Sequence, residues 1–263
     1  FYFNISLIIC NMSKRKKNQK DKKSKKTKYE EIINSLEKKI KKLEKTLDEN
    51  NYKFGLFYKE KKDYENQYNY FLKASTNNHI QSNFELGIMF LYGQYINKDI
   101  DKAIKYFELA ATNNCSCAYC FLAEIFYDKN IGKSIEYYKK AVKLNNNNAC
   151  NNLATIYNNN QKYKNNKESF RLFELAAKNG HKLAQCNLAN MYRKGIGIGV
   201  DFKKAVYWYK KAAEQNNLTA KYNLSMMYIN YGNDNNKKKG KKMLEELAYN
   251  NYEKAKEKLK KLI

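Results

Sequence analysis

Small residues recur along this chain at a fixed spacing of 13 residues. An alanine that ends one amphipathic segment is followed, 13 positions later, by a small residue inside the next segment. The five pairs are Ala74/Gly87, Ala110/Ala123, Ala141/Ala154, Ala176/Ala189 and Ala212/Ser225. The distance from each small residue to the next segment-ending alanine varies between 18 and 23 residues. Stacked helix pairs need one connection of fixed length and tolerate variation in the other, so this spacing predicts an all-α solenoid.

Each repeat contains two segments with different patterns. The first segment has a small residue, Leu, a second small residue and an aromatic at offsets 0, 4, 5 and 8, which lie on one face of a helix. Its instances are Ser82/Leu86/Gly87/Phe90, Ala118/Leu122/Ala123/Phe126, Ala149/Leu153/Ala154/Tyr157, Ala184/Leu188/Ala189/Tyr192 and Ala220/Leu224/Ser225/Tyr228. The second segment starts with Lys-Ala or Lys-Ser and continues to two adjacent aromatics, as at Lys102-Ala103, Lys133-Ser134 and Lys204-Ala205. We therefore expect about six antiparallel helix pairs over residues 51–263, with a charged half-repeat at 253–263 that closes the array.

The segment before the repeats, residues 29–50, has a different period. Its apolar residues are separated by alternating steps of four and three, which is the a/d pattern of a coiled coil with Ile at a and Leu at d. Lys39 and Glu44 occupy the g and e positions that pair across a parallel dimer. The segment holds under three heptads, so two interpretations stay open. It forms either an N-terminal cap that packs on the first repeat or a weak dimer through Ile33, Leu36, Ile40, Leu43 and Leu47.

Composition adds a strong positive charge. The chain has 51 Lys and Arg against 26 Asp and Glu, a net charge of +25. Residues 14–28 hold ten of these basic residues and one acidic residue, and such a block repels itself and cannot build a core. We expect residues 1–28 to be a disordered leader and basic arm, with Met12 as the start of the natural chain. The arm is suited to nuclear import, nucleic-acid contact or anionic-membrane contact, or else is a solvated tail; its basic residues are Lys14, Arg15, Lys16, Lys17, Lys22, Lys23, Lys25 and Lys26.

No pattern of residues points to catalysis, a metal or a cofactor. Cys120 and Cys186 occupy one repeat position and are expected to pack as small side chains, and the Cys115–Cys120 cluster lacks the second pair that zinc needs. The Gly195-Ile-Gly197-Ile-Gly199 run has no preceding strand, so it is expected to form a helix-pair turn rather than a phosphate loop. No apolar run approaches the roughly 18 residues of a membrane span. We therefore expect a non-enzymatic protein in a reducing intracellular compartment, the cytoplasm or the nucleus.

Residues 184–213 resemble the Sel1-like repeat, a relative of the tetratricopeptide repeat. They contain Ala-Gln-Cys-Asn-Leu-Ala-Asn-Met-Tyr, then Gly-Ile-Gly-Val-Asp, then Lys-Ala-Val-Tyr-Trp-Tyr-Lys-Lys-Ala-Ala, which follow the family pattern at nearly every position. The match is good over 82–113 and looser over 54–78, 118–146, 149–179 and 220–249, where the Gly-x-Gly turn is missing. The resemblance implies a right-handed superhelix of antiparallel helix pairs, a role as adaptor or scaffold, and no catalytic residues. It also implies a structural role for His79 and His181, because the family often has His at this position.

Similarity to tetratricopeptide arrays implies which side chains line the concave face. They lie at offsets +2, +6 and +9 from the first small residue of each repeat. The candidate partner-binding residues are Phe84, Ile88, Glu124, Tyr127, Asn151, Thr155, Asn158, Asn190, Arg193, Tyr222 and Met226. The central asparagines would bind a peptide backbone and Arg193 a carboxylate. None belongs to the packing frame, so we expect Asn190 and Arg193 to be replaceable without loss of the fold.

The function predicted from the sequence is therefore a scaffold that binds a protein partner through a helical-repeat surface. The alternative is a nucleic-acid-associated protein that uses the basic arm and a basic solenoid. Lys residues are spread around the predicted helices rather than gathered in one stripe, which favours the scaffold. The sequence does not name the partner, the face that binds it or the oligomeric state.

Overall fold

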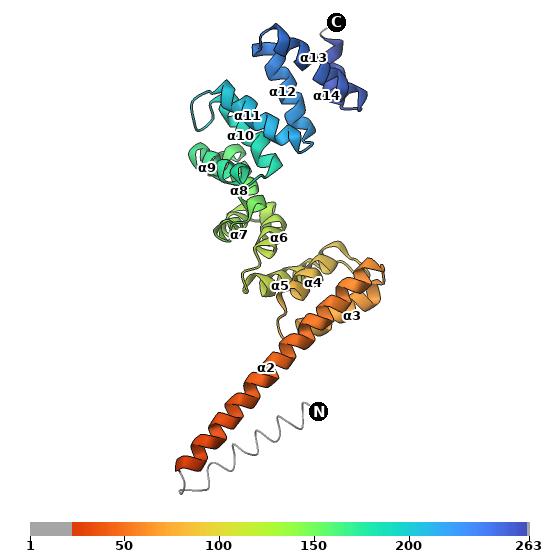
Figure 1. Cartoon of the computed structure of the whole chain (residues 1–263), viewed down its shortest axis with the longest axis vertical. Helices are drawn as coiled ribbons and strands as arrows, with labels where there is room; N and C mark the ends of the chain where they lie inside the picture. Colours follow the sequence, from red (N-terminus) through yellow and green to blue (C-terminus); the bar gives the residue numbers. More distant parts are fainter. Residues whose placement is uncertain (1–22, 262–263) are drawn as a thin grey trace. The chain divides into compact units, whose positions relative to one another are not determined.

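The structure is a computed structural model that describes the backbone of residues 23–261, with side chains from residue 29 onward. Within these residues every regular element is helical, with thirteen α-helices and one short 3-10 helix, so the predicted all-α class is confirmed (Figure 1). The helices are α2 (Lys23–Glu60), α3 (Tyr64–Ser75), α4 (Ile80–Tyr92), α5 (Ile100–Ala111), α6 (Ser116–Tyr127), α7 (Ile131–Lys143), α8 (Asn147–Asn159), α9 (Asn166–Lys178), α10 (Lys182–Lys194), α11 (Phe202–Glu214), α12 (Leu218–Tyr231), α13 (Asp234–Tyr249) and α14 (Glu253–Lys260), with η2 (Gln161–Tyr163) between α8 and α9.

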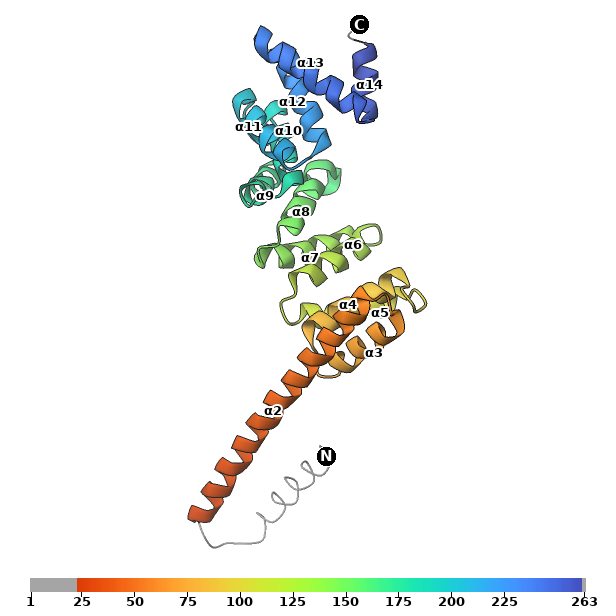
Figure 2. The same cartoon turned by 45° about the vertical axis from the view of Figure 1, so that its right-hand side comes forward.

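The helices form consecutive pairs in two compact units. Unit 1 ends at Asn113 and contains the pairs α2–α3 and α4–α5. Unit 2 begins at Asn114 and contains α6–α7, α8–α9, α10–α11 and α12–α13, with α14 packed on α13 (Figure 2). This arrangement confirms the six expected helix pairs and the C-terminal half-repeat.

The residues of the predicted frame form the core. Five of them are fully buried, with 0% of their surface exposed: Leu86, Leu122, Ala123, Ala154 and Ala189. In α4 the frame position is Gly87, where a Cβ atom would lie 2.6 Å from the Phe107 ring of α5. Small residues are needed here because the partner helix approaches closely and an aromatic ring fills the remaining space.

Two consecutive residues set the geometry of the fixed-length turn between one helix pair and the next. The first has a positive φ angle and the second caps the next helix, as in Asn145 (φ 58°) followed by Asn146, and Asn216 (φ 59°) followed by Asn217. Asn adopts positive φ more readily than most residues and its side chain is also a good N-cap. This two-residue turn explains why 13 residues separate the small residues of neighbouring helices.

Histidine replaces asparagine as the cap in two of these turns. Nδ1 of His79 accepts a hydrogen bond from the backbone N–H of Ser82, and Nδ1 of His181 accepts one from Ala184, at 3.3 and 3.2 Å. Both histidines therefore have the structural role that was expected of them. Desolvation, followed by the nearby charge of Lys182, lowers the pKa of His181 and favours the neutral form that can accept this bond.

Helix α2 differs from the element predicted for this region. It is a single helix of 38 residues that starts before residue 29 and crosses the expected boundary at 50/51. Asn50 and Asn51 do not interrupt it, because no proline is present and most of the segment consists of strong helix formers such as Lys, Glu and Leu. Lys23, Lys25 and Lys26 accordingly lie in the first turns of a helix and not in a disordered arm, while Lys14, Arg15, Lys16, Lys17 and Lys22 lie outside the described residues.

Candidate functional site

Unit 2 contains a pocket of about 250 Å³ between α8, α9 and α10. Its walls are mostly polar and its floor is apolar. The lining residues are Thr155, Asn158, Asn159, Phe173, Asn187, Asn190, Met191, Lys194 and Ile196. Three of them, Thr155, Asn158 and Asn190, are residues that the sequence predicted for the concave face, and the structure brings them together.

The asparagines of the pocket have hydrogen-bonding capacity beyond the bonds they make within the described residues. Nδ2 of Asn158 donates to Oδ1 of Asn159 at 2.7 Å, and Nδ2 of Asn187 donates to Oδ1 of Asn151 at 3.1 Å. A side-chain amide offers two donor hydrogens and an acceptor oxygen with two lone pairs, so each amide retains capacity for a ligand. The lining can therefore bind both the N–H and the C=O groups of a peptide.

Asn190 has a second role that the sequence did not reveal. Its Oδ1 accepts a hydrogen bond of 2.7 Å from the hydroxyl of Tyr209 in α11, whose side chain is fully buried. Burial raises the pKa of Tyr209 to about 12, so the hydroxyl remains protonated and acts as a donor at neutral pH. Removing the Asn190 side chain would leave this buried donor without its acceptor, which costs about 1–3 kcal/mol. Replacing Asn190 is therefore expected to lower stability, which nothing in the sequence indicated.

The +2 positions of unit 2 do not line the pocket. Cys120, Asn151 and Cys186 expose only 7%, 7% and 4% of their surface, because they face neighbouring helices. Asn151 also uses both polar atoms of its amide, one toward Asn187 and the other toward Asn152. Asn187, at offset +3 of the next repeat, lines the pocket where Asn151 does not.

Residues at offsets +3 and +10 are those that the sequence reasoning missed. Asn187 lies at +3 of its repeat, while Asn159 and Lys194 lie at +10. A signal was available, because three consecutive first helices carry Asn at +3, namely Asn152, Asn187 and Asn223. Sequence offsets alone do not reveal it, because the rotation of each helix about its axis decides which of two adjacent positions reaches the surface.

The other candidate residues lie outside this pocket. Phe84 and Ile88 are half-buried on α4 of unit 1. In unit 2, Glu124 and Tyr127 are exposed on α6, and desolvation by the surrounding helices raises the pKa of Glu124. Arg193 on α10 and Tyr222 and Met226 on α12 are half-buried. The pocket thus contains the centre of the predicted surface and not its ends.

Cys120 and Cys186 are packing residues, whereas Cys117 is exposed. Burial raises the pKa of Cys120 to about 12 and that of Cys186 to about 11, so both thiols remain protonated and unreactive at neutral pH. From residue 29 onward the side chains form no group of three or more His, Cys, Asp or Glu that could hold a metal ion. No helix of the described residues has the length and apolar character needed to cross a membrane.

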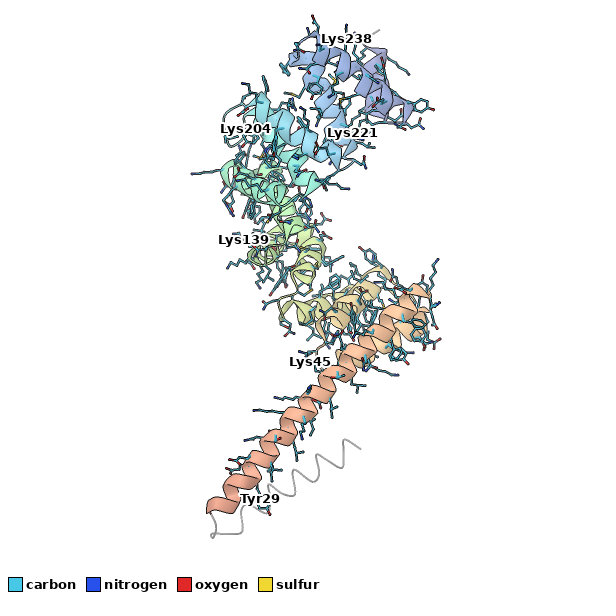
Figure 3. The ribbon with its side chains drawn as sticks, in the orientation of Figure 1. Tyr29, Lys45, Lys139, Lys204, Lys221 and Lys238 are labelled. Atoms are coloured by element: carbon cyan, nitrogen blue, oxygen red, sulfur yellow. The ribbon has the colours of Figure 1, made fainter. Side chains whose placement is uncertain are left out.

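Repeat-motif lysines also have structural contacts. Nζ of Lys133 lies 3.9 Å from the centroid of the Phe126 ring, and Lys102 and Lys204 lie 5.3 Å from the rings of Phe90 and Tyr192. Each contact joins the first turn of a second helix to the aromatic of the preceding first helix, where a cation–π interaction contributes about 0.5–1 kcal/mol. In unit 2 the labelled Lys139 and Lys204 lie on one side and Lys221 on the other, so these three lysines do not share one face (Figure 3).

Comparison with known proteins agrees with this geometry. Two solved structures share the fold. The c5321 protein of uropathogenic Escherichia coli, described as displaying an SLR fold, has a TM-score of 0.73 at 22% identity, over 79% of this chain and 47% of that one. A Sel1 repeat protein from Oxalobacter formigenes has a TM-score of 0.60 at 27% identity, over 68% of this chain and 74% of that one.

One curated relative is chitin synthase regulatory factor 3 of Schizosaccharomyces pombe, which is 38% identical over 63 residues. The alignment covers 24% of this chain and 7% of the relative, so this chain matches only a small part of that protein. The Sel1 repeat family itself matches four consecutive segments, residues 80–115, 114–146, 147–181 and 182–217. Because these segments span more than half of the chain, the protein belongs to the Sel1 repeat family.

Proposed function

We propose that this protein is a non-enzymatic scaffold that binds an extended segment of a protein partner in the pocket between α8 and α10. Sel1 repeat proteins generally mediate protein–protein interaction, and they are typically non-enzymatic. The observation that carries the proposal is the lining itself, in which four asparagine amides surround an apolar floor of Phe173, Met191 and Ile196. Amides bind a peptide backbone in either direction, while an apolar floor accepts a side chain of the peptide.

Charge indicates what kind of segment binds there. Lys194 lines the pocket and is exposed, and the chain as a whole carries a net charge of +25. A basic surface attracts acidic partners over long range and raises the rate of association. We therefore expect a partner segment that carries Asp or Glu beside a small apolar residue.

The name of the fungal relative is consistent with this role. A regulatory factor of chitin synthase is a protein whose effect is exerted on another protein. The alignment is too short to transfer that partner to this chain, so the proposal concerns the class of activity only.

A variant pair tests the proposal. Asn158→Arg places a long side chain in the pocket and loses only the bond to Asn159, whereas Asn235→Arg makes the same change at an exposed position of α13. Both variants and the unmodified protein would be used as baits in affinity capture from the natural source, followed by quantitative mass spectrometry. We expect the recovery of specific partners to fall at least tenfold with Asn158→Arg, which corresponds to about 1.4 kcal/mol of binding free energy, and to be unchanged with Asn235→Arg. Equal recovery with all three baits would exclude the pocket as the binding site.

A second candidate function rests on the basic arm. The ten basic residues between positions 14 and 28 form a charge block suited to phosphate contact, and we propose that they serve nucleic-acid binding or nuclear import of an intracellular protein. Deleting residues 13–22 should abolish salt-dependent nucleic-acid binding and nuclear accumulation while leaving the circular dichroism of the repeats unchanged. The deletion removes six of the ten basic residues, so tight salt-dependent binding by the deletion variant would instead place the phosphate contacts on the helices from Lys23 of α2 onward.

A further inference from the structure

Helix α2 carries an apolar stripe along one side. The exposed fractions of Leu36, Leu43 and Leu47 are 37%, 60% and 51%, although Ile33 exposes only 7%. Because α2 continues beyond residue 50, the stripe continues as well, to Phe54 and Phe57 at 52% and 50% exposed. The a/d pattern therefore covers about four heptads from Tyr29 to Phe57, with one polar residue, Asn50, at a d position, and this length is enough for a short coiled coil.

The opposite side of α2 packs on the repeats of unit 1. Both carboxylate oxygens of Asp48 accept hydrogen bonds from Nδ2 of Asn77, at 3.0 and 3.3 Å. Gly55 approaches the Phe71 ring of α3 so closely that a Cβ atom would lie 2.4 Å from it. Nζ of Lys59 donates to Glu85 of α4 at 2.6 Å.

These packing residues lie at heptad positions b and f, so the stripe at a and d is directed elsewhere. Phe54 is the exception, because its ring also lies 5.3 Å from that of Tyr70 in α3. The first half of α2 extends beyond α3 in both views, with side chains projecting from it between the labelled Tyr29 and Lys45 (Figures 1 to 3). Between Leu36 and Leu47 the stripe can therefore be covered without disturbing the contacts that hold α2 to the repeats.

The charged residues beside the stripe favour binding of a second α2 helix, from another copy of this chain, in parallel orientation. Glu37 and Glu44 occupy e positions, and Lys39 and Lys53 occupy g positions. In a parallel pair, a g residue faces the e residue five positions later in the other helix, which places Lys39 opposite Glu44 of the second copy. An antiparallel pair centred on the same stripe would instead place Glu37 opposite Glu44 of the second copy, which is repulsive. Ile at a and Leu at d also favour two parallel strands.

We propose that two copies of this protein associate through α2 as a parallel two-stranded coiled coil. This inference goes beyond the proposed scaffold function and does not depend on it. The dimer would present two copies of the pocket between α8 and α10, so that a partner with two binding segments would bind more tightly than through either segment alone.

Sedimentation equilibrium of the full chain in reducing buffer tests the inference. Over concentrations from about 1 to about 100 μM, we expect the mass to rise from 31.1 kDa toward twice that value. Leu43→Glu puts a charge into the stripe and should leave the chain monomeric. The matched control is Leu183→Glu, at a leucine of α10 that is 50% exposed and off the stripe, and it should dimerise like the unmodified protein.

A charge-exchange series tests the orientation. Lys39→Glu and Glu44→Lys should each weaken dimerisation by about tenfold, since each turns two exposed attractive pairs into repulsive ones. The double variant restores opposite charges and should recover the original affinity. Stronger association of Glu44→Lys alone would overturn the parallel arrangement, because only the antiparallel pair is relieved by that change.

Three other outcomes would overturn the dimer itself. The first is a monomer at every concentration. The second is a monomer that becomes a dimer only after deletion of residues 1–22, which would assign the stripe to that segment of the same chain. The third is a dimer that persists in Leu43→Glu, which would place the interface elsewhere.

Discussion

At the scale of single residues, asparagine has three different roles in this chain. Asn146 and Asn217 cap helices, Asn145 and Asn216 adopt positive φ before those caps, and Asn158 and its neighbours line the pocket. Asparagine is so abundant in the sequence that its frequency carries no information about any of these roles. Only its position within the repeat, combined with the direction of the side chain in the folded structure, separates a cap from a binding residue.

The His181 cap gives stability a dependence on pH. The pKa of His181 is lowered in the folded state from its ordinary value of 6.5, so the unfolded chain binds the proton more readily. Stability should therefore be full above pH 6.5 and fall as the pH decreases through and below that value. His181→Asn keeps the cap, as Asn146 and Asn217 do at the same repeat position, and removes the titration.

Melting temperatures measured across this pH range should therefore fall more steeply for the unmodified protein than for His181→Asn. Parallel curves for the two proteins would show that protonation of His181 does not break the cap. Other titrating groups affect both proteins alike, so the difference between the two curves isolates this histidine.

At the scale of elements, the close approach of paired helices depends on the small residues of the frame. Ala189 in α10 exposes none of its surface, so Ala189→Leu should overpack the α10–α11 pair and lower the free energy of unfolding by about 1–3 kcal/mol. Thr219→Leu adds a leucine at an exposed position of α12 and should change stability by less than about 0.5 kcal/mol. Urea denaturation of both variants measures this difference, and equal midpoints would mean that the α10–α11 interface is loosely packed.

The length of α2 illustrates the limit of prediction at this scale. Periodicity located its apolar stripe, but the helix does not end at residue 50 as predicted, and Asn50 and Asn51 are only weak helix breakers. The helix continues because Tyr52, Leu56 and Phe71 form a core cluster with α3 and α4. Tertiary packing of this kind outweighs a local preference of a few tenths of a kcal/mol.

At the scale of the whole molecule, stability in a repeat array is carried mainly by contacts between neighbouring helices. Helix α14 covers one such surface, because Ala255 and Leu259 pack with Leu244 and Leu247 of α13. Removing residues 253–263 should expose these leucines and increase hydrogen exchange in α13, with little change in α8 to α10. Uniform loss of protection throughout unit 2 would instead show that unit 2 unfolds as a single cooperative body.

The sequence by itself determined the helix pairs, their number, the packing frame and the family, because these follow from local periodicity and from a turn of fixed length. It also located three residues of the pocket, Thr155, Asn158 and Asn190. Tertiary structure alone decided that Asn187 and Lys194 line the pocket while Asn151 does not, since the rotation of each helix against its neighbours selects the exposed positions. The same holds for the bond between Asn190 and Tyr209 and for the free side of α2, because they depend on how neighbouring helices pack and not on periodicity within one helix.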